Sequence, residues 1–239
     1  MESITQTSHL LADYDRLARS VRMRLLDRYH AKLVWGVIAE ARLELAKLIP
    51  KIPNIGMGNV WPFNLDTSVM ILALYRALKK YSYSLPESGQ VIYDVYEAYL
   101  TRYPLVLRRV YRRYYFSQYH RDRLRHGAIR SQLCRYPDDW IFTFLDGDGV
   151  TFDFGINISE CAIQKLYRAQ NAVEFTPYVC QLDHAVGKFL GLGFNRQDTL
   201  AHGAGVCDCR WKLGAATPGW PPSSDTVLQD SYSKLEVSI

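Results

Sequence analysis

The stretch Trp140-Ile-Phe-Thr-Phe-Leu-Asp146-Gly-Asp-Gly149-Val-Thr-Phe-Asp-Phe-Gly-Ile156 decides the fold class of this chain. Apolar residues occupy every second position on both sides of the Asp- and Gly-rich turn at residues 146–149. A period of two is typical of a β-strand with one buried face. The stretch is therefore predicted to form a β-hairpin with one apolar face.

The sequence before the hairpin follows a helical period instead. Residues 10–26 and 31–49 place apolar side chains three or four positions apart, as amphipathic helices do. Pro50 and Pro53 are predicted to end the second helix, and Asp66 or Thr67 to cap a third that runs to Lys80. Further helices are expected at residues 86–103, 105–115 and 117–134.

The sequence after the hairpin combines helices and strands. Ser159 is predicted to cap a helix over 160–170, and Pro177 to begin one that ends at Leu190. Strands are expected at 194–202 and 206–213, on either side of Gly203 and Gly205. The predicted fold is α+β, a helical N-terminal half packed on a four-stranded antiparallel sheet with two inserted helices.

These elements predict a single domain over residues 1–216, helical over 9–136 and mixed over 137–216. Residues 217–239 are Pro- and Ser-rich at first and are expected to form a C-terminal tail. With 48% hydrophobic and 22% charged residues, the composition is that of a globular protein and excludes a disordered chain.

Targeting segments and cysteines indicate the cellular compartment in which a protein is expected. Neither a signal peptide nor a run of about 18 apolar residues is recognised, so we expect no membrane association and a cytoplasmic location. Five cysteines are present, and Cys207 and Cys209 are too close in sequence for an ordinary disulfide with each other. Free thiols in a reducing compartment are predicted.

Positive charge is concentrated in residues 102–135, which hold ten arginines against one acid, Asp122. Interleaved Arg and Tyr residues can contact phosphates and stack on bases, but no known nucleic-acid-binding motif surrounds them. We expect a solvated helix face with a few arginines turned toward an anionic small molecule, and no nucleic-acid partner.

Reactive side chains gather in the second half of the chain. On the predicted helix, Cys180, Asp183 and His184 stand at i, i+3 and i+4 and so share one side. A carboxylate beside a thiol can deprotonate or position a water, or orient an imidazole. The alternative is that Cys180 is a small buried apolar group and Asp183 a solvated one.

On the last predicted strand, alternation places Cys207 and Cys209 on one face and Asp208 and Arg210 on the other. Either the thiols face inward and the acid and guanidinium form an outer ion pair, or the charged pair faces a substrate and the thiols pack in the core. Gly203 and Gly205 allow close approach of a ligand to the backbone, or simply form a turn.

A metal or cofactor site is not predicted. Cys180, His184, Cys207 and Cys209 are residue types that bind zinc, but their spacings do not match the usual zinc motifs. The turn at 146–149 is too short for a calcium loop. The glycines at 56 and 58 lack the strand-turn-helix setting of a dinucleotide site.

Three blocks give the chain a resemblance to a known family. They are FGINISEC at 154–161, FTPYVCQLD at 175–183 and TLAHGAGVCDCR at 199–210, with residues 49–56 and 73–76 similar to the family's first half. The chain resembles the L-2-amino-thiazoline-4-carboxylic acid hydrolases. The resemblance implies ring opening of a cyclic amidine, in which water adds to the carbon between sulfur and nitrogen and the carbon–sulfur bond breaks to leave N-carbamoyl-L-cysteine.

The resemblance also implies site residues. The chain departs from the family pattern at Cys209, where phenylalanine is expected, and at His202, where the family often has a residue that does not titrate. Asp183 is expected as base or orienter, Cys180 or Cys207 as its thiol partner, and Arg210 as a bidentate carboxylate clamp. Cys161 and Asp208 also match the family pattern and are candidates for substrate binding. Two histidines are candidates apart from the resemblance: His202 as a catalytic residue and His184 as a substrate-binding one.

Three functions follow as hypotheses. The first is a hydrolase that opens a small thiazoline or cyclic amidine acid. The second is a relative recruited to secondary metabolism as a cyclase for a larger apolar substrate, working by shape and hydrogen bonding, for which the 17 Tyr, 9 Phe and 5 Trp offer an apolar pocket. The third is a non-catalytic protein that binds a small carboxylate. Each has a small-molecule partner and leaves a homo-oligomer open.

Overall fold

The computed structural model describes residues 2–56 and 58–219, and these form an α+β fold. The first half is helical, with α1 (Glu2–Leu26), α2 (Ala31–Leu48), the 3-10 helix η1 (Ile49–Lys51), α3 (Pro62–Lys80), α4 (Leu85–Thr101), α5 (Leu105–Tyr115) and α6 (Gln118–Ser131). The second half has β1 (Ile141–Asp146), β2 (Phe154–Glu160), α7 (Ala162–Ala169), η2 (Val173–Phe175), α8 (Thr176–Leu190), β3 (Phe194–Asn195), η3 (Leu200–His202) and β4 (Cys207–Trp211).

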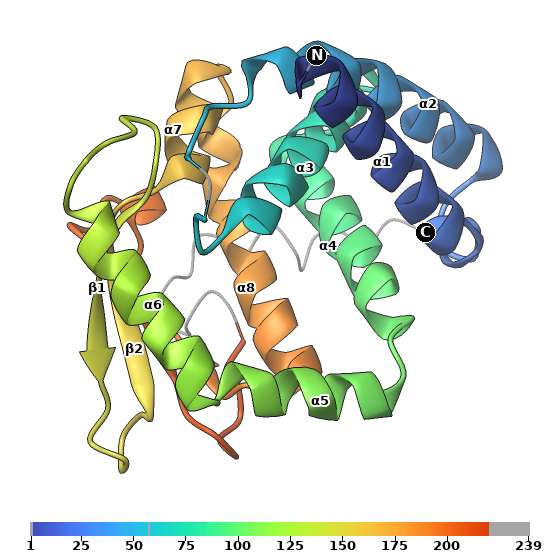
Figure 1. Ribbon diagram of the computed structural model, residues 1–239. Helices are drawn as coiled ribbons and strands as arrows, with labels where there is room; N and C mark the ends of the chain where they lie inside the picture. The colour runs from blue at the N-terminus through green and yellow to red at the C-terminus, as the bar shows by residue number, and fades with distance from the viewer. Residues whose placement is uncertain (1, 57, 220–239) are drawn as a thin grey trace.

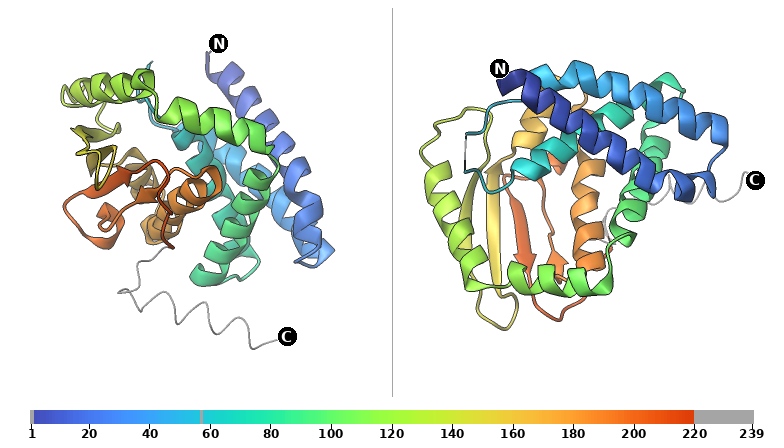
Figure 2. Two further views of the ribbon diagram at one scale, coloured as in Figure 1. Left: turned by 90° about the horizontal axis from the view of Figure 1, so that it is seen from below. Right: turned by 45° about the vertical axis from the view of Figure 1, so that its right-hand side comes forward.

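The strands form one antiparallel sheet in the order β1-β2-β4-β3, with α7 and α8 inserted between β2 and β3. This confirms the predicted fold class. In Figures 1 and 2, α1 to α4 form a helical layer, α6 lies along β1, and α8 runs between that layer and the sheet. Helix α5 connects α4 to α6 and crosses the end of α8.

Local signals explain several helix ends. Helix α4 begins with a capping box, in which the Ser84 Oγ accepts from the Glu87 backbone N–H and the Glu87 carboxylate accepts from the Ser84 N–H. Helix α8 carries Pro177 in its first turn, as predicted, and ends at Leu190, where Gly191 caps it with a positive φ of 65°. Helix α5 has the predicted limits.

Two predicted helix caps are wrong. Helix α3 begins at Pro62, whose missing N–H suits the first turn, so Asp66 and Thr67 lie inside the helix. Helix α7 has Cys161 at its N-cap, because β2 stays paired with β1 as far as Glu160. Ser159 therefore lies in β2 and donates to the Ile141 carbonyl.

The strands are shorter than predicted. Val150 is 80% exposed, because the Asp148 carboxylate accepts from the backbone N–H groups of Val150 and Thr151 and extends the turn. Strand β3 ends at Asn195, and the chain then turns through η3 before β4. Of the predicted tail, residues 220–239 lie outside the described part of the chain.

The inner face of the sheet lies at the centre of the core. Alternation places Phe154 and Ile156 of β2 on this face, opposite Trp211 and Cys209 of β4, and all four are buried. Phe154 is fully buried and stacks on Trp211 with ring centroids 5.1 Å apart. Burial of one such side chain contributes about 1.5–3 kcal/mol.

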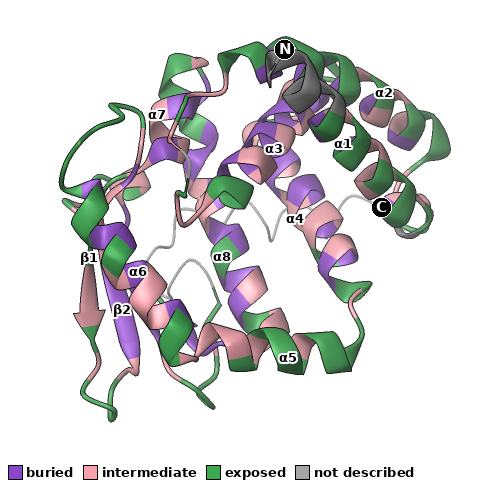
Figure 3. Ribbon diagram, viewed as in Figure 1, coloured by how far each residue is buried: buried purple, intermediate pink, exposed green. Residues whose placement is uncertain are grey.

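The helices differ in how far their residues are buried. Figure 3 shows buried residues along α3, α4 and α8, whereas no residue of α5 is buried. Each helix that the structure describes is too short or too polar to span a membrane.

Candidate functional site

The centre of the site is an ion pair between α8 and the segment after β3. The Asp183 Oδ2 accepts from the Arg196 Nη1 at 2.8 Å, and the Arg196 Nη2 donates to the Cys180 carbonyl at 2.6 Å. The Arg196 side chain is only 3% exposed, whereas that of Asp183 is 51% exposed. A buried guanidinium needs a counter-charge, so this pair fixes the carboxylate at a surface that water can reach.

The charge state of Arg196 follows from two opposing effects. Burial lowers the pKa of Arg196, but attraction to the Asp183 carboxylate and the hydrogen bond to it outweigh this effect, so the pKa lies above that of a free guanidinium. Arg196 therefore stays positive. Sequence reasoning missed this residue, although the period of two that places Phe194 inward in β3 also directs Arg196 inward.

Four thiols surround the ion pair. Cys180 lies one turn before Asp183, Cys207 and Cys209 occupy the inner face of β4, and Cys161 precedes α7. The negative charge of Asp183 acts on all four. The predicted residues Cys161, Cys180, Asp183 and Cys207 are thus brought together, and Cys209 joins them.

Burial decides the protonation of these thiols. It raises the pKa of Cys207 to about 11 and that of Cys209 to about 12. Burial also raises the pKa values of Cys161 and Cys180. The Cys207 Sγ in addition accepts the Leu200 N–H at 3.2 Å. Reactive cysteines have lowered pKa values, so these four are neutral thiols at pH 7.

Two tyrosines extend the site toward the helical layer. Tyr96 of α4 and Tyr115 of α5 are both close enough to Asp183 for its charge to act on them. Burial is the larger cause of the rise in their pKa values, so both hydroxyls remain protonated donors. The Tyr115 ring lies 5.7 Å from that of Trp211 on the inner face of the sheet.

Helix α6 adds an imidazole and a guanidinium over the same face. His120 is 8% exposed, its ring is 4.5 Å from that of Tyr115, and neither ring nitrogen has a hydrogen-bond partner within the described residues. Burial lowers the pKa of His120 to about 4, so the ring is neutral at pH 7. The Arg121 guanidinium lies 5.4 Å from the Phe154 ring and forms no ion pair within the part of the chain described. Both residues belong to the arginine-rich segment, which was expected to turn a few arginines toward an anionic small molecule.

Arg210, expected as the carboxylate clamp, does not share a face with the thiols near Asp183. Arg210 is on the outer face of β4, where its guanidinium donates to the Ile156 carbonyl and to the Asn157 Oδ1. Asp208 shares that face and accepts from the backbone N–H groups of residues 197 and 198. Strand alternation separates the two sets of side chains, and the thiol face is the one that turns inward. No ion pair joins Asp208 to Arg210 among the described residues.

The two histidine candidates have other surroundings. His184 is buried, with its ring 4.9 Å from that of Phe194 and its Nδ1 3.2 Å from the Pro218 carbonyl oxygen. Burial lowers the pKa of His184 to about 4. His202 is exposed at the end of η3, with its Nδ1 2.7 Å from the Thr199 Oγ1. Among the residues whose side chains the structure describes, no three His, Cys, Asp or Glu side chains are arranged to hold a metal ion.

A helical layer on an antiparallel sheet, with a guanidinium-held carboxylate among neutral thiols, defines an α+β protein with a half-exposed carboxylate at its candidate site. A sequence model of the family described as L-2-amino-thiazoline-4-carboxylic acid hydrolase matches residues 67–211, so the chain belongs to this family. The matched segment includes the three motif blocks and the ion pair, but not residues 49–56. Membership supports a hydrolase-like role at the level of the family. No curated protein and no solved structure is significantly similar to the chain.

Proposed function

We propose that this protein hydrolyses a small cyclic amidine or thiazoline carboxylic acid, with Asp183 as the general base. The observation that carries the proposal is the Asp183–Arg196 pair, in which one carboxylate oxygen is held and the other is not. The Asp183 Oδ1 has no hydrogen bond within the described residues, and the side chain is half-exposed. A water can therefore bind this oxygen and lose a proton to it.

In the proposed reaction, Asp183 takes a proton from water as the water oxygen bonds to the carbon between sulfur and nitrogen. The electron pair of the carbon–nitrogen double bond moves to nitrogen, which takes up a proton from solvent water. The carbon–sulfur bond of the adduct then breaks with its electrons on sulfur, while the added hydroxyl releases its proton to solvent water and its O–H electron pair forms the carbonyl of the carbamoyl group. The proton held by Asp183 passes to the departing sulfur, so the net change is addition of one water. Return of a proton by the same carboxylate is ordinary acid–base catalysis.

The protonation of the thiols argues against a covalent route. With a pKa of about 11, Cys207 is a thiolate in roughly one molecule in ten thousand at pH 7. Cys180 and Cys161 are shifted in the same direction by burial. These thiols are proposed to form neutral walls of the site, where they exclude water and donate weakly to the substrate.

A substrate carboxylate needs a cation, and Arg210 faces the other way. We assign this role to Arg121, because its guanidinium lies over Phe154 on the inner face and has no carboxylate partner in the described residues. Arginine binds carboxylates in bidentate fashion. The Tyr115 hydroxyl is proposed as a donor to a ring nitrogen.

The cyclase for a larger apolar substrate remains a second candidate. The aromatic wall formed by Tyr115, Trp211 and Phe154 favours it, because such rings bind apolar surfaces as well as filling cores.

The test is an assay of ring opening of 2-amino-thiazoline-4-carboxylate, in which the free thiol that forms is measured over time. Asp183→Asn is expected to lower kcat by about a hundredfold or more, whereas Cys180→Ala and Cys207→Ala lower it less. Asp138→Asn is the matched control, since Asp138 is exposed and distant from these elements in sequence. A wild-type protein without turnover would refute the hydrolase proposal, and binding of an apolar product instead would favour the cyclase. If the Asp183→Asn variant is active and the Cys180→Ala or Cys207→Ala variant is inactive, the result would contradict Asp183 as the general base and favour a nucleophilic cysteine.

A further inference from the structure

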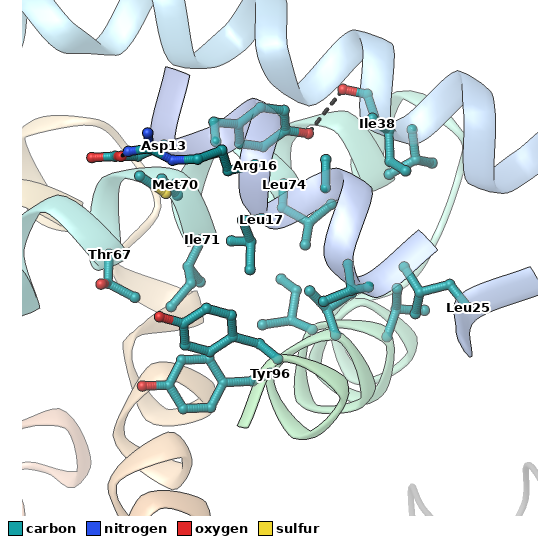
Figure 4. A pocket seen from close by; sticks show the side chains of 18 of the residues that line it. Asp13, Arg16, Leu17, Leu25, Ile38, Thr67, Met70, Ile71, Leu74 and Tyr96 are labelled. Carbon is teal, nitrogen blue, oxygen red and sulfur yellow. Dashed lines mark hydrogen bonds and ion pairs between the residues drawn. The ribbon is translucent and has the colours of Figure 1, made fainter. Parts of the chain in front are cut away.

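A cavity of about 380 Å³, partly open to solvent, lies in the helical layer between α1, α2, α3 and α4. Figure 4 shows Leu17 of α1 and Ile71 of α3 directed into it, with Tyr96 of α4 on one side. Most of the lining side chains are aliphatic or aromatic. The cavity is distinct from the inner face of the sheet, and Tyr96 is common to its wall and to the surroundings of Asp183.

The size of the cavity indicates a ligand. Protein interiors have few voids larger than a water molecule, and an engineered apolar cavity of about 150 Å³ stays dry and binds benzene. The present cavity, at about 380 Å³, has room for an apolar body of two or three rings. Ligand pockets of about 300–1,000 Å³ are typically apolar with a few polar groups that orient the ligand.

The polar groups of the wall indicate the ligand's head group. The Tyr14 hydroxyl donates to the Ile38 carbonyl and the Tyr29 hydroxyl to Asp94, so both are satisfied within the protein. Asp66 is half-buried and forms neither an ion pair nor a hydrogen bond with the residues described here. A carboxylate in such a place favours a cation or a hydrogen-bond donor as its partner.

The neighbouring charges strengthen this preference. The charge of Asp13 acts on Asp66, but Asp13 is itself paired with Arg16, so the three side chains leave one negative charge at the wall of the cavity. Burial, followed by the charge of Asp13, raises the pKa of Asp66, as expected for a carboxylate that lacks a cation. Arg102 also lines the cavity, but it is exposed and lies over the Tyr99 ring at 4.1 Å, so solvent screens its charge.

We propose that this cavity is a binding site for a small apolar amine, with a body of two or three rings between α1, α3 and α4 and its ammonium group at Asp66. Binding here needs no chemistry at Asp183, so the site stands independently of the proposed hydrolysis. Because Tyr96 borders both places, a ligand in the cavity comes next to the Asp183 site.

The probes are 2-naphthylmethylamine and 2-naphthoic acid, which share a two-ring body and differ in charge. Isothermal titration of the full chain at pH 7 is expected to show the amine binding at least about tenfold more tightly than the acid, about 1.4 kcal/mol in binding free energy. Asp66→Asn is expected to abolish that preference. Leu17→Trp, which fills the cavity, is expected to weaken amine binding by at least about tenfold.

Controls separate the site from the rest of the surface. Leu43→Trp adds a tryptophan on the exposed side of α2 and is the control for Leu17→Trp. Asp138→Asn removes an exposed carboxylate elsewhere and is the control for Asp66→Asn. Both control variants should bind the amine as the wild type does. If Leu17→Trp does not fold, Ala18→Leu fills part of the same cavity. Absence of saturable amine binding, or unchanged binding in the filled variants, would overturn the site. Equal affinities for amine and acid would overturn the assignment of its ligand.

Discussion

The Asp183–Arg196 pair is expected to respond asymmetrically to loss of either partner. Its nitrogen and oxygen are 2.8 Å apart, but the Arg196 side chain is 3% exposed and that of Asp183 is 51% exposed. Breaking a buried pair costs about 3–5 kcal/mol because one charge is left without its partner. The cost therefore depends on which charge remains.

Asp183→Asn leaves the buried guanidinium without a counter-charge. The amide oxygen still accepts a hydrogen bond, so the loss in the free energy of unfolding is expected at about 2–3 kcal/mol. Arg196→Met leaves Asp183, which water can hydrate, and keeps most of the buried volume. Its expected loss is about 1–2 kcal/mol, and the double variant should lose at least about 1 kcal/mol less than the sum of the two.

Urea unfolding followed by tryptophan fluorescence gives the four free energies of this cycle. The control cycle uses Asp15→Asn and Arg42→Met, whose paired side chains are 34% and 46% exposed. Coupling in that exposed pair is expected at about 0.2–1 kcal/mol. A larger loss in Arg196→Met than in Asp183→Asn, or additivity within about 0.5 kcal/mol, would refute this account of the ion pair.

Four further outcomes are expected. The free energy of unfolding should fall as the pH drops from about 6.5 to about 4, by at most about 3 kcal/mol for each of His120 and His184. In this range the two imidazoles are protonated in the unfolded chain but stay neutral in the folded protein, where their pKa values are near 4. Urea titrations at several pH values measure this. His120→Phe should flatten that fall, and since neither ring nitrogen has a partner among the described residues, it should cost nothing at pH 7; a large loss there would show that the imidazole has a partner. Ser84→Ala should lower stability by about 1 kcal/mol through loss of the α4 cap, as thermal unfolding can test. In the native protein, a thiol reagent should label Cys134, the exposed cysteine, and in urea all five, which mass spectrometry can count; rapid native labelling of Cys180 or Cys207 would contradict the protonated state of both thiols.

Much of the local structure could be predicted from the sequence. The limits of α5 and the start of α8 agree with the apolar spacing and with Pro177, because helical period and helix capping are properties of neighbouring residues. Helix ends that depend on long-range pairing were predicted less well. Cys161 caps α7 only because β2 remains bonded to β1 up to Glu160, which nothing near Ser159 indicates.

The candidate site was predicted in part for the same reason. That Cys180 and Asp183 share one side of a helix, and that Cys207 and Cys209 share one face of a strand, follows from periodicity alone. Which strand face turns inward depends on where α8 and α6 pack, and the structure turns the thiols in and Arg210 out. His120 and Arg121 could not be predicted as site residues, because the sequence does not distinguish them from the other basic residues of the arginine-rich segment.

The sequence by itself determined the order of helices and strands, the apolar face of the hairpin and the membership of the family. Only the tertiary structure decided that Arg196 is the cation that holds Asp183, because the two meet through the pairing of β3 with β4 and the packing of β3 on α8. The cavity in the helical layer is likewise formed by four helices together. Local spacing specifies the direction of a side chain within its own element, whereas the partner it meets depends on contacts between elements.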